Sequence, residues 1–415
     1  MAKTSSLTRT IIICALGYFI DVFDIQLFAV LRVPSLTEMG VTAERLPVIS
    51  GYILNAQMLG MITGAFLWGW LGDRFGRLKA LYGSILIYSL GTLACSLAQT
   101  PLDYGILRFV TGFGLAGETG AAITLIAEMM SPQKRGWGIT LVAGIGFLGP
   151  VAAVLISWFV EWRTTYVIAG ILGLALLILR MNLTEPALFQ KISRSLDTRG
   201  SLKILMQPKQ ALLFIYCLLM GLPLMYSWSL LNFFSMEFSK ATLAPDQAFN
   251  QKLCLLIFYI GTSLGDFISG AISQIWKSRR KTLALLFVIG AVVGLGFLIL
   301  GPSAQYTTTA FYIIYFILGI VGGGWVLMAT VFSEHFGTNI RATTSITLTN
   351  LVRGCTIPML FAFEWLRGIM SITHAAIVIG AVFYALAFLA LSQLKETHGL
   401  DLDYVEDIKK VRAKA

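Results

Sequence analysis

GWLGDRFGRLK, residues 69–79, places four charged side chains and three glycines between two long apolar runs, at 47–71 and 79–98. Each run is near the ~20 residues that a helix needs to cross a bilayer. Glycine permits the tight turn that a short connection requires. The stretch therefore predicts a short polar loop between two membrane helices.

The same alternation of apolar runs and polar breaks continues along all 415 residues. The chain is 57% hydrophobic and 13% charged, with a mean hydropathy of +0.79, as is typical of a multi-pass membrane protein. The first run is long and carries two aspartates, so we expect a retained helix and not a cleaved signal peptide. Twelve membrane helices are predicted, at 10–31, 47–71, 79–98, 103–128, 136–159, 164–182, 210–235, 252–275, 282–301, 307–330, 342–362 and 373–393.

Lys and Arg are distributed unevenly between alternate loops. The loops on the side of the N-terminus hold 23 of them, so the positive-inside rule predicts that both termini are cytoplasmic. The net charge of +10 is then a topology signal, and no nucleic-acid partner is expected. The opposite loops are expected to hold six cations, Arg32, Arg45, Arg163, Lys240, Lys252 and Arg367.

The two halves of the chain share a spaced pattern of polar residues. Glu128 precedes Arg135 by seven residues, and Glu334 precedes Arg341 by the same spacing. Matching positions lie 203, 206 and 208 residues apart, which predicts two related bundles that meet at a midplane cavity. We expect a six-helix bundle at 1–182, a cytoplasmic linker at 183–209, a second six-helix bundle at 210–394 and a cytoplasmic tail at 395–415.

The loop 69–79 resembles the signature loop of the major facilitator superfamily. DVFDIQLF (21–28) and RFVTGFGLAGE (108–118) are similar to first-helix and fourth-helix motifs of the metabolite:proton symporters within that superfamily. EMMSPQKRG (128–136) and TEPALF (184–189) resemble loop motifs that these symporters share with sugar porters. The resemblance implies an all-α membrane protein with twelve helices in two bundles, which rock to expose a central site to either side in turn.

The charged loop residues are predicted to act as a conformational latch. Asp73 and the neighbouring arginines can bridge helix ends through charge-assisted hydrogen bonds. A degraded copy of the loop, GAISQIWKSRRK (270–281), has Gln274 in place of the aspartate. The predicted latch comprises Asp73, Arg74, Gly76, Arg77, Glu128, Arg135, Glu334 and Arg341.

Charged side chains inside the spans are the candidates for proton coupling, because an exposed charge in the bilayer costs at least a few kcal/mol. Asp24 and Arg108 lie at similar depths and can meet, either to couple protonation to opening or as a permanent structural pair. Asp21 can share the proton or contact substrate. Glu118 can be a second proton station or an acid that fixes helix packing, and Asp266 is expected to satisfy a helix interface.

Arg353 is the main candidate for binding substrate, because a guanidinium can hold a carboxylate with two parallel hydrogen bonds. Pairing with Asp266 or a first-helix aspartate is the alternative. Pro223 and Gly221 permit a bend in the seventh span, whose aromatic residues serve either the ligand or packing. The further substrate candidates are Asn350, Tyr226, Trp228, Asn232 and Gln26.

The sequence contains no HExxH, CxxC or Walker motif, so no metal, cofactor or enzymatic activity is expected. The predicted function is proton-coupled symport of a small organic acid or zwitterion by a monomer in the bacterial inner membrane. A proton-antiport exporter of drug-like or siderophore-like compounds is the alternative, although Ala152 and Ala153 stand where its fifth-helix motif has paired glycines. A non-transporting sensor would need a signalling domain longer than the tail after residue 394.

Overall fold

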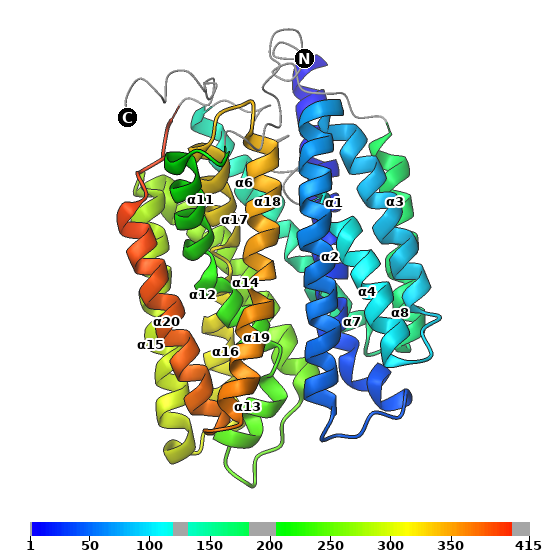
Figure 1. Ribbon diagram of the computed structural model, residues 1–415, viewed down its shortest axis with the longest axis vertical. Coiled ribbons are helices and arrows are strands. Elements are labelled where there is room, and N and C mark those ends of the chain that lie inside the picture. The colour runs from blue at the N-terminus through cyan, green and yellow to red at the C-terminus, as the bar shows by residue number, and fades with distance from the viewer. Residues whose placement is uncertain (1, 119–131, 182–204, 401–415) are drawn as a thin grey trace.

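The computed structural model describes residues 2–118, 132–181 and 205–400, and within these ranges the chain is helical. The one β-type contact that they contain is a single bridge between Leu243 and Tyr306. Most helices run along the long axis of the molecule (Figure 1). We call the end at which the first helix begins and the last helix ends the inner end, and the opposite end the outer end.

The helices follow the apolar runs of the sequence. In chain order they are α1 (Ala2–Glu38), α2 (Leu46–Phe75), α3 (Arg77–Cys95), α4 (Pro101–Leu115), α6 (Pro132–Gly146), α7 (Leu148–Ile156), α8 (Trp162–Arg180), α11 (Pro208–Met220), α12 (Leu222–Met225), the π-helix η1 (Tyr226–Asn232), α13 (Ser235–Thr242), α14 (Gln251–Ile275), α15 (Arg279–Ala304), α16 (Thr308–Gly322), α17 (Trp325–His335), α18 (Arg341–Gly354), α19 (Thr356–Arg367) and α20 (Ile372–Gln393).

Ten helices among the described residues are long and apolar enough to cross a membrane, and Thr140–Ile156 forms a shorter apolar helix. The prediction of an all-helical, multi-pass protein is therefore confirmed. The fourth predicted span, 103–128, runs beyond the described residues after α4. The count of twelve helices and the cytoplasmic position of the termini stay predictions.

Helix starts are marked by local capping. Thr100 and Asp103 form a capping box at the start of α4, in which each side chain accepts a hydrogen bond from the backbone N–H of the other. Asn250 and Ser278 cap α14 and α15 in the same side-chain-to-backbone manner. The polar breaks that separate the apolar runs thus also set where the helices begin.

The first helix is longer than predicted. It continues past residue 31 to Glu38, with Pro34 inside it. The expectation that Arg32 lies in a loop is wrong, because Arg32 belongs to α1 and is fully buried. Its charge is neutralised by a partner in the second half of the chain, described below, and that partner compensates for its burial.

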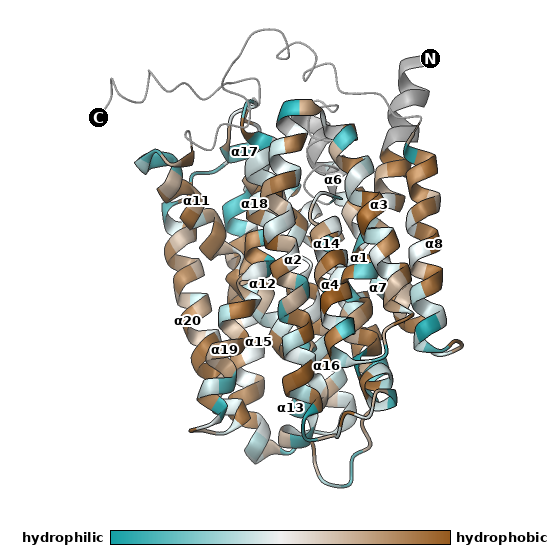
Figure 2. Cartoon of the chain, turned by 45° about the vertical axis from the view of Figure 1, so that its right-hand side comes forward, coloured by the Kyte–Doolittle hydropathy of each residue, from teal (hydrophilic) through white to brown (hydrophobic). Residues whose placement is uncertain are grey.

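Two groups of helices lie side by side (Figure 1). Helices α1–α4, α7 and α8 lie on one side of the view, and α11–α20 lie on the other. Brown, hydrophobic residues line most helix surfaces in Figure 2, while teal residues gather at loops and helix ends. Large apolar side chains such as Phe159, Ile178 and Val292 are exposed, as expected of a surface that faces lipid.

Within each group, glycines bring two helices into close contact, and the helices concerned are equivalent in the two groups. A Cβ atom on Gly60 or Gly64 of α2 would lie 2.1–2.2 Å from a carbonyl oxygen of α4. A Cβ atom on Gly261 or Gly265 of α14 would lie 2.4 or 2.2 Å from a carbonyl oxygen of α16. Such spacing requires glycine at each position and is typical of tightly packed membrane helices. The same kind of glycine packing thus occurs in both halves of the chain.

Candidate functional site

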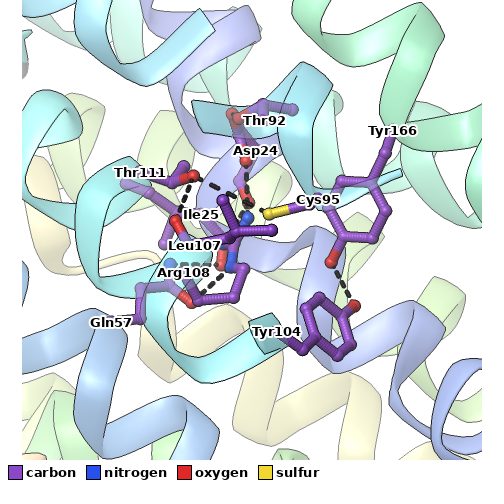
Figure 3. Close-up of polar contacts among 10 residues, drawn as sticks. All are labelled: Asp24, Ile25, Gln57, Thr92, Cys95, Tyr104, Leu107, Arg108, Thr111 and Tyr166. Carbon is purple, nitrogen blue, oxygen red and sulfur yellow. Dashed lines mark hydrogen bonds and ion pairs between the residues drawn. The ribbon is translucent and has the colours of Figure 1, made fainter. Parts of the chain in front are cut away.

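Asp24 and Arg108 form a buried ion pair inside the first half (Figure 3). Arg108 Nη1 lies 2.9 Å from Asp24 Oδ1, and Nη2 donates to the Asp24 carbonyl oxygen over 3.0 Å. The hydroxyl of Thr92 donates to Asp24 Oδ2, and Arg108 Nε donates to Gln57 Oε1 over 3.3 Å. One side chain from each of α1, α2, α3 and α4 therefore enters this cluster, so its charge state is linked to how the four helices pack.

The chemistry of this pair is that of a buried, compensated charge. The two side chains are 0% and 2% exposed, so removing one charge leaves the other uncompensated at a cost of about 3–5 kcal/mol. Arg108 also lies under the ring of Tyr166, 5.9 Å from its centroid. A proton added to Asp24 would weaken its hold on Arg108 and loosen the four-helix junction.

Glu118 pairs with a residue that sequence reasoning missed. Arg180, the last residue of α8, places Nη1 2.8 Å from Glu118 Oε2 and Nη2 2.5 Å from Glu118 Oε1. Both side chains are buried. A Cβ atom on Gly17 of α1 would lie 1.6 Å from Arg180 Nη2, so glycine is required for the guanidinium to enter the bundle. A separation of 62 residues between the partners offers no sequence signal for the pair.

A layer of aromatic rings connects the two halves near Arg353. The Arg353 guanidinium carbon lies 4.7 Å from the centroid of the Trp325 ring, within cation–π distance. Trp325 stacks on Trp228 with centroids 5.9 Å apart, and Trp228 meets Phe147 edge to face at 4.9 Å. Phe147 in turn meets Tyr18 of α1 at 5.9 Å. We call Tyr18, Phe147, Trp228 and Trp325 the aromatic layer.

Asp21 lies on α1, three residues after Tyr18 of this layer. It is fully buried, and its carboxylate acts electrostatically on the Arg353 guanidinium. Arg353 Nη1 contacts Asn350 Oδ1 at 3.5 Å, while Asn350 Nδ2 donates to the Ala116 carbonyl oxygen at 2.9 Å. The arrangement places one acid from the first half and one cation from the second beside the aromatic rings.

The other substrate candidates do not gather in one place. Trp228 belongs to the aromatic layer, and its indole Nε1 has no hydrogen-bond partner among the described residues. Tyr226 packs instead against Tyr384 of α20, with centroids 6.0 Å apart, inside the second half. Gln26 accepts a hydrogen bond from the Tyr259 hydroxyl at 3.0 Å, and Asn232 is buried at the end of η1. Asn232 thus ends a π-helix, and π-helical turns are frequent at functional sites.

The two halves also touch at both ends of their interface. At the outer end, Arg32 and Glu237 of α13 form an ion pair at 3.0 Å. Arg32 lies over the Phe233 ring, 4.7 Å from its centroid. At the inner end, the Thr343 hydroxyl donates to the Gly69 carbonyl oxygen at 3.4 Å. The two halves are thus in contact at both ends of their interface in this conformation.

These features match a known family. The family model of the Major Facilitator Superfamily matches residues 14–357. The chain belongs to the Major Facilitator Superfamily. As a member it is a membrane transporter and not an enzyme.

Similar proteins of this superfamily carry names that state a cargo. The chain is 27% identical to a putative niacin/nicotinamide transporter of Bacillus subtilis strain 168, over 80% of this chain and 82% of that protein. It is 28% identical to the 3-(3-hydroxy-phenyl)propionate transporter of Escherichia coli K12, over 71% of each. The solved proton:xylose symporter XylE superposes with a TM-score of 0.75 at 15% identity, over 97% of this chain and 98% of that one, which shows the shared fold.

The superfamily loop is described only in part. Gly76, with φ of 114°, joins α2 to α3, and the Arg74 guanidinium lies 5.2 Å from the centroid of the Trp70 ring. Asp73 and Arg77 occupy the end of α2 and the start of α3, and Arg135 belongs to α6, but their side chains lie outside the described part of the chain. Glu128 lies outside it altogether.

The degraded copy of that loop holds an ion pair despite Gln274. Arg279 Nη2 lies 3.5 Å from Glu334 Oε1, and Arg279 Nη1 donates to the Ser273 hydroxyl at 2.7 Å. Arg341 donates from Nε to the Ser333 carbonyl oxygen at 3.1 Å. Sequence reasoning missed Arg279, although its place in the copied loop is a signal that a motif alignment between halves would use.

Asp266 belongs to an interface between helices of the second half. Its Oδ1 accepts a hydrogen bond from the backbone N–H of Val326 on α17 at 3.3 Å, and its side chain is buried. Among the described residues, no group of three or more His, Cys, Asp or Glu side chains is placed to hold a metal ion.

Proposed function

We propose that this transporter imports a small, flat carboxylate, of the aromatic monocarboxylate class, together with protons. The single observation that carries the proposal is the buried Arg353 beside Trp325, at the meeting of the two halves. Import would proceed by rocking of two six-helix bundles, 1–182 and 210–394, of a twelve-helix monomer in the bacterial inner membrane. In this arrangement both termini, the linker 183–209 and the tail 395–415 are cytoplasmic.

The aromatic layer favours a planar cargo. A guanidinium can grip a carboxylate through two parallel hydrogen bonds, and an indole face beside it offers a surface for a ring. The unpaired indole Nε1 of Trp228 is a donor for a further polar group on that ring. Relatives are named for transport of niacin, 3-(3-hydroxy-phenyl)propionate and benzoate, which fit this chemistry.

The rings must separate for such a cargo to bind. A ring inserted between two others needs about 7–8 Å between the outer pair, given about 3.5–4.0 Å per contact. Trp228 of the second half and Phe147 of the first half stand only 4.9 Å apart, centroid to centroid. Opening of the halves and loading of the site would therefore be one movement.

Proton coupling follows from the balance of charge. Arg353 can neutralise one carboxylate, and Asp21 already acts on it. A substrate carboxylate that takes over Arg353 would leave Asp21 without its counter-charge in a water-poor site, which favours uptake of a proton by Asp21. Asp24 with Arg108, one turn further along α1, would relay that change to the packing of the first bundle.

The test is transport by purified protein in liposomes that contain a pH dye. Nicotinate, benzoate, 3-phenylpropionate, a dicarboxylate, a betaine, a siderophore and xylose are added in turn to wild type, Arg353→Lys and Asp24→Asn. We expect one aromatic acid to acidify the lumen of liposomes with the wild-type protein. Arg353→Lys should raise the KM for that acid about 10–100-fold, because a lysine cannot form two parallel hydrogen bonds to a carboxylate. Asp24→Asn should abolish acidification.

Arg367→Lys is the matched control, since Arg367 pairs with Glu364 at a partly exposed site on α19. Proton entry driven by xylose alone, or normal uptake by Arg353→Lys, would contradict the aromatic acid assignment. If no compound moves protons inward and a compound loaded inside exchanges for them, the protein is an antiport exporter.

A further inference from the structure

A basic cavity lies at the inner end of the second half, away from the aromatic layer. It has a volume of about 670 Å³ and lies where the turn between α14 and α15 meets the end of α20. Helices α15 and α20 pack side by side (Figure 1). The cavity is lined by Trp276, Lys277, Arg280, Lys281, Phe388 and Glu396, among others.

Three cations reach this cavity within five residues. Lys277, Arg280 and Lys281 line it, whereas Arg279 between them pairs with Glu334 inside the bundle. Lys277 has a φ of 50°, a left-handed conformation that ends α14 and starts the tight turn. Neither lysine ammonium has an ion pair among the described residues, and both lysines are exposed.

The acid that lines the cavity is already satisfied. Glu396 accepts hydrogen bonds from the Ser278 hydroxyl at 2.5 Å and from the backbone N–H groups of Arg279 and Arg280 at 2.8 and 3.3 Å. Its charge is therefore committed to the first turn of α15. The three basic side chains then leave the cavity with an excess of positive charge.

An apolar surface continues from the basic cavity toward the middle of the membrane. Ala284, Phe388 and Leu391 line the cavity itself. Val288 and Val292 follow at four-residue steps along the same face of α15, and they are 49% and 68% exposed. Trp276 is half exposed at the rim, where tryptophan is typical of a membrane–water interface.

We propose that this cavity binds the headgroup of an anionic phospholipid, with its acyl chains along α15 and α20. Phosphate is the ligand that Lys and Arg clusters recognise, and basic pockets at the cytoplasmic ends of membrane helices suit anionic lipid headgroups. The combination of cations above and exposed valines below fits a lipid and not a soluble anion. The proposal does not depend on the transported substrate.

The experiment measures binding of phosphatidylglycerol, with phosphatidylcholine for comparison, to delipidated full-length protein by native mass spectrometry. Lys277→Gln/Arg280→Gln/Lys281→Gln is compared with a control that removes the same charge at the same end, Arg74→Gln/Lys79→Gln/Lys209→Gln. We expect the first variant to lose at least about 10-fold in phosphatidylglycerol affinity, since each cation near a lipid surface contributes about 1 kcal/mol. The control should retain wild-type affinity.

A second variant, Lys277→Gln/Lys281→Gln, changes only two exposed side chains and should therefore fold. Its melting temperature checks that it does. Equal loss of affinity in the control, or none in either site variant, would overturn the proposal. Competition by glycerol 3-phosphate as strong as by the lipid would show a site for soluble phosphate instead. Binding seen only after removal of 401–415, which holds four acidic residues, would show that the tail fills the cavity.

Discussion

Asp21 and Asp24 stand three residues apart on α1 but have different electrostatic partners. Asp24 is held by Arg108 within its own bundle, at 2.9 Å. Asp21 acts on Arg353, which belongs to the other bundle. Asp21 suits a role in coupling, because its partner moves relative to it when the halves rock. Asp24 suits a supporting role, because its partner stays beside it within the same half. The two acids therefore call for separate tests.

Asp21→Asn should separate proton coupling from substrate binding. Asparagine is neutral, so Arg353 stays available to the substrate carboxylate while the group that would take the proton is gone. We expect exchange of labelled substrate across liposomes at about the wild-type rate, and loss of accumulation driven by a pH gradient. Accumulation as strong as in wild type would rule out Asp21 as the coupling group.

At the scale of elements, the start of α15 depends on a residue that follows α20. Glu396 and Ser278 both satisfy N–H groups in the first turn of α15, and the positive end of the helix dipole favours the carboxylate. Burial acts to raise the pKa of Glu396, but the hydrogen bonds from Ser278, Arg279, His398 and Arg280 outweigh it and hold the pKa below 4.5.

Glu396→Gln should lower stability by about 1 kcal/mol at neutral pH, the usual size of a capping contribution. Because the folded-state pKa is lowered, the stabilisation is present above about pH 4.5 and is lost as the pH falls through the folded-state value. Melting temperatures of wild type and variant, measured from pH 7 to pH 3, should therefore converge. Glu364→Gln, which removes a partly exposed pair on α19, should cost less than Glu396→Gln at neutral pH.

The broken helices of the second half were foreseen only in part. Gly221 and Pro223 predicted a bend in the seventh span, and the structure resolves that span into α11, α12 and the π-helix η1. The tenth span also divides, at Gly323 and Gly324, into α16 and α17. An apolar run predicts that a segment crosses the membrane, but the places where its helix breaks depend on neighbouring helices. At Gly323, for example, a Cβ atom would lie 2.4 Å from the backbone N of Asp266.

At the scale of the whole molecule, the pair of Arg32 and Glu237 links the two halves at the outer end. Arg32 is fully buried and lies over the Phe233 ring, while the Glu237 side chain is 10% exposed. Since the pair forms only when the halves meet at that end, it stabilises the conformation that is closed at the outer end, as defined above.

Glu237→Gln should shift the protein toward a conformation that is open at the outer end, because it leaves Arg32 buried without its counter-charge. Spin labels at Arg45 and Asp246, in outer loops of the two halves, would report a larger fraction of long distances. Glu38→Gln is the control, since Glu38 contacts Trp162 and Arg163 within the first half. An unchanged distance distribution in Glu237→Gln would show that the pair does not set the outer closure.

Sequence patterns are enough to identify a multi-pass helical transporter with buried charges in α1, α4 and α18. Those properties depend on composition, on the length of apolar runs and on local motifs, all of which are read within about 20 residues. Tertiary structure alone decided the partners: Arg180 for Glu118, Glu237 for Arg32, Arg279 for Glu334, and the rings around Arg353. These partners lie 28 to 205 residues apart, and they meet because close glycine packing sets which faces of distant helices touch.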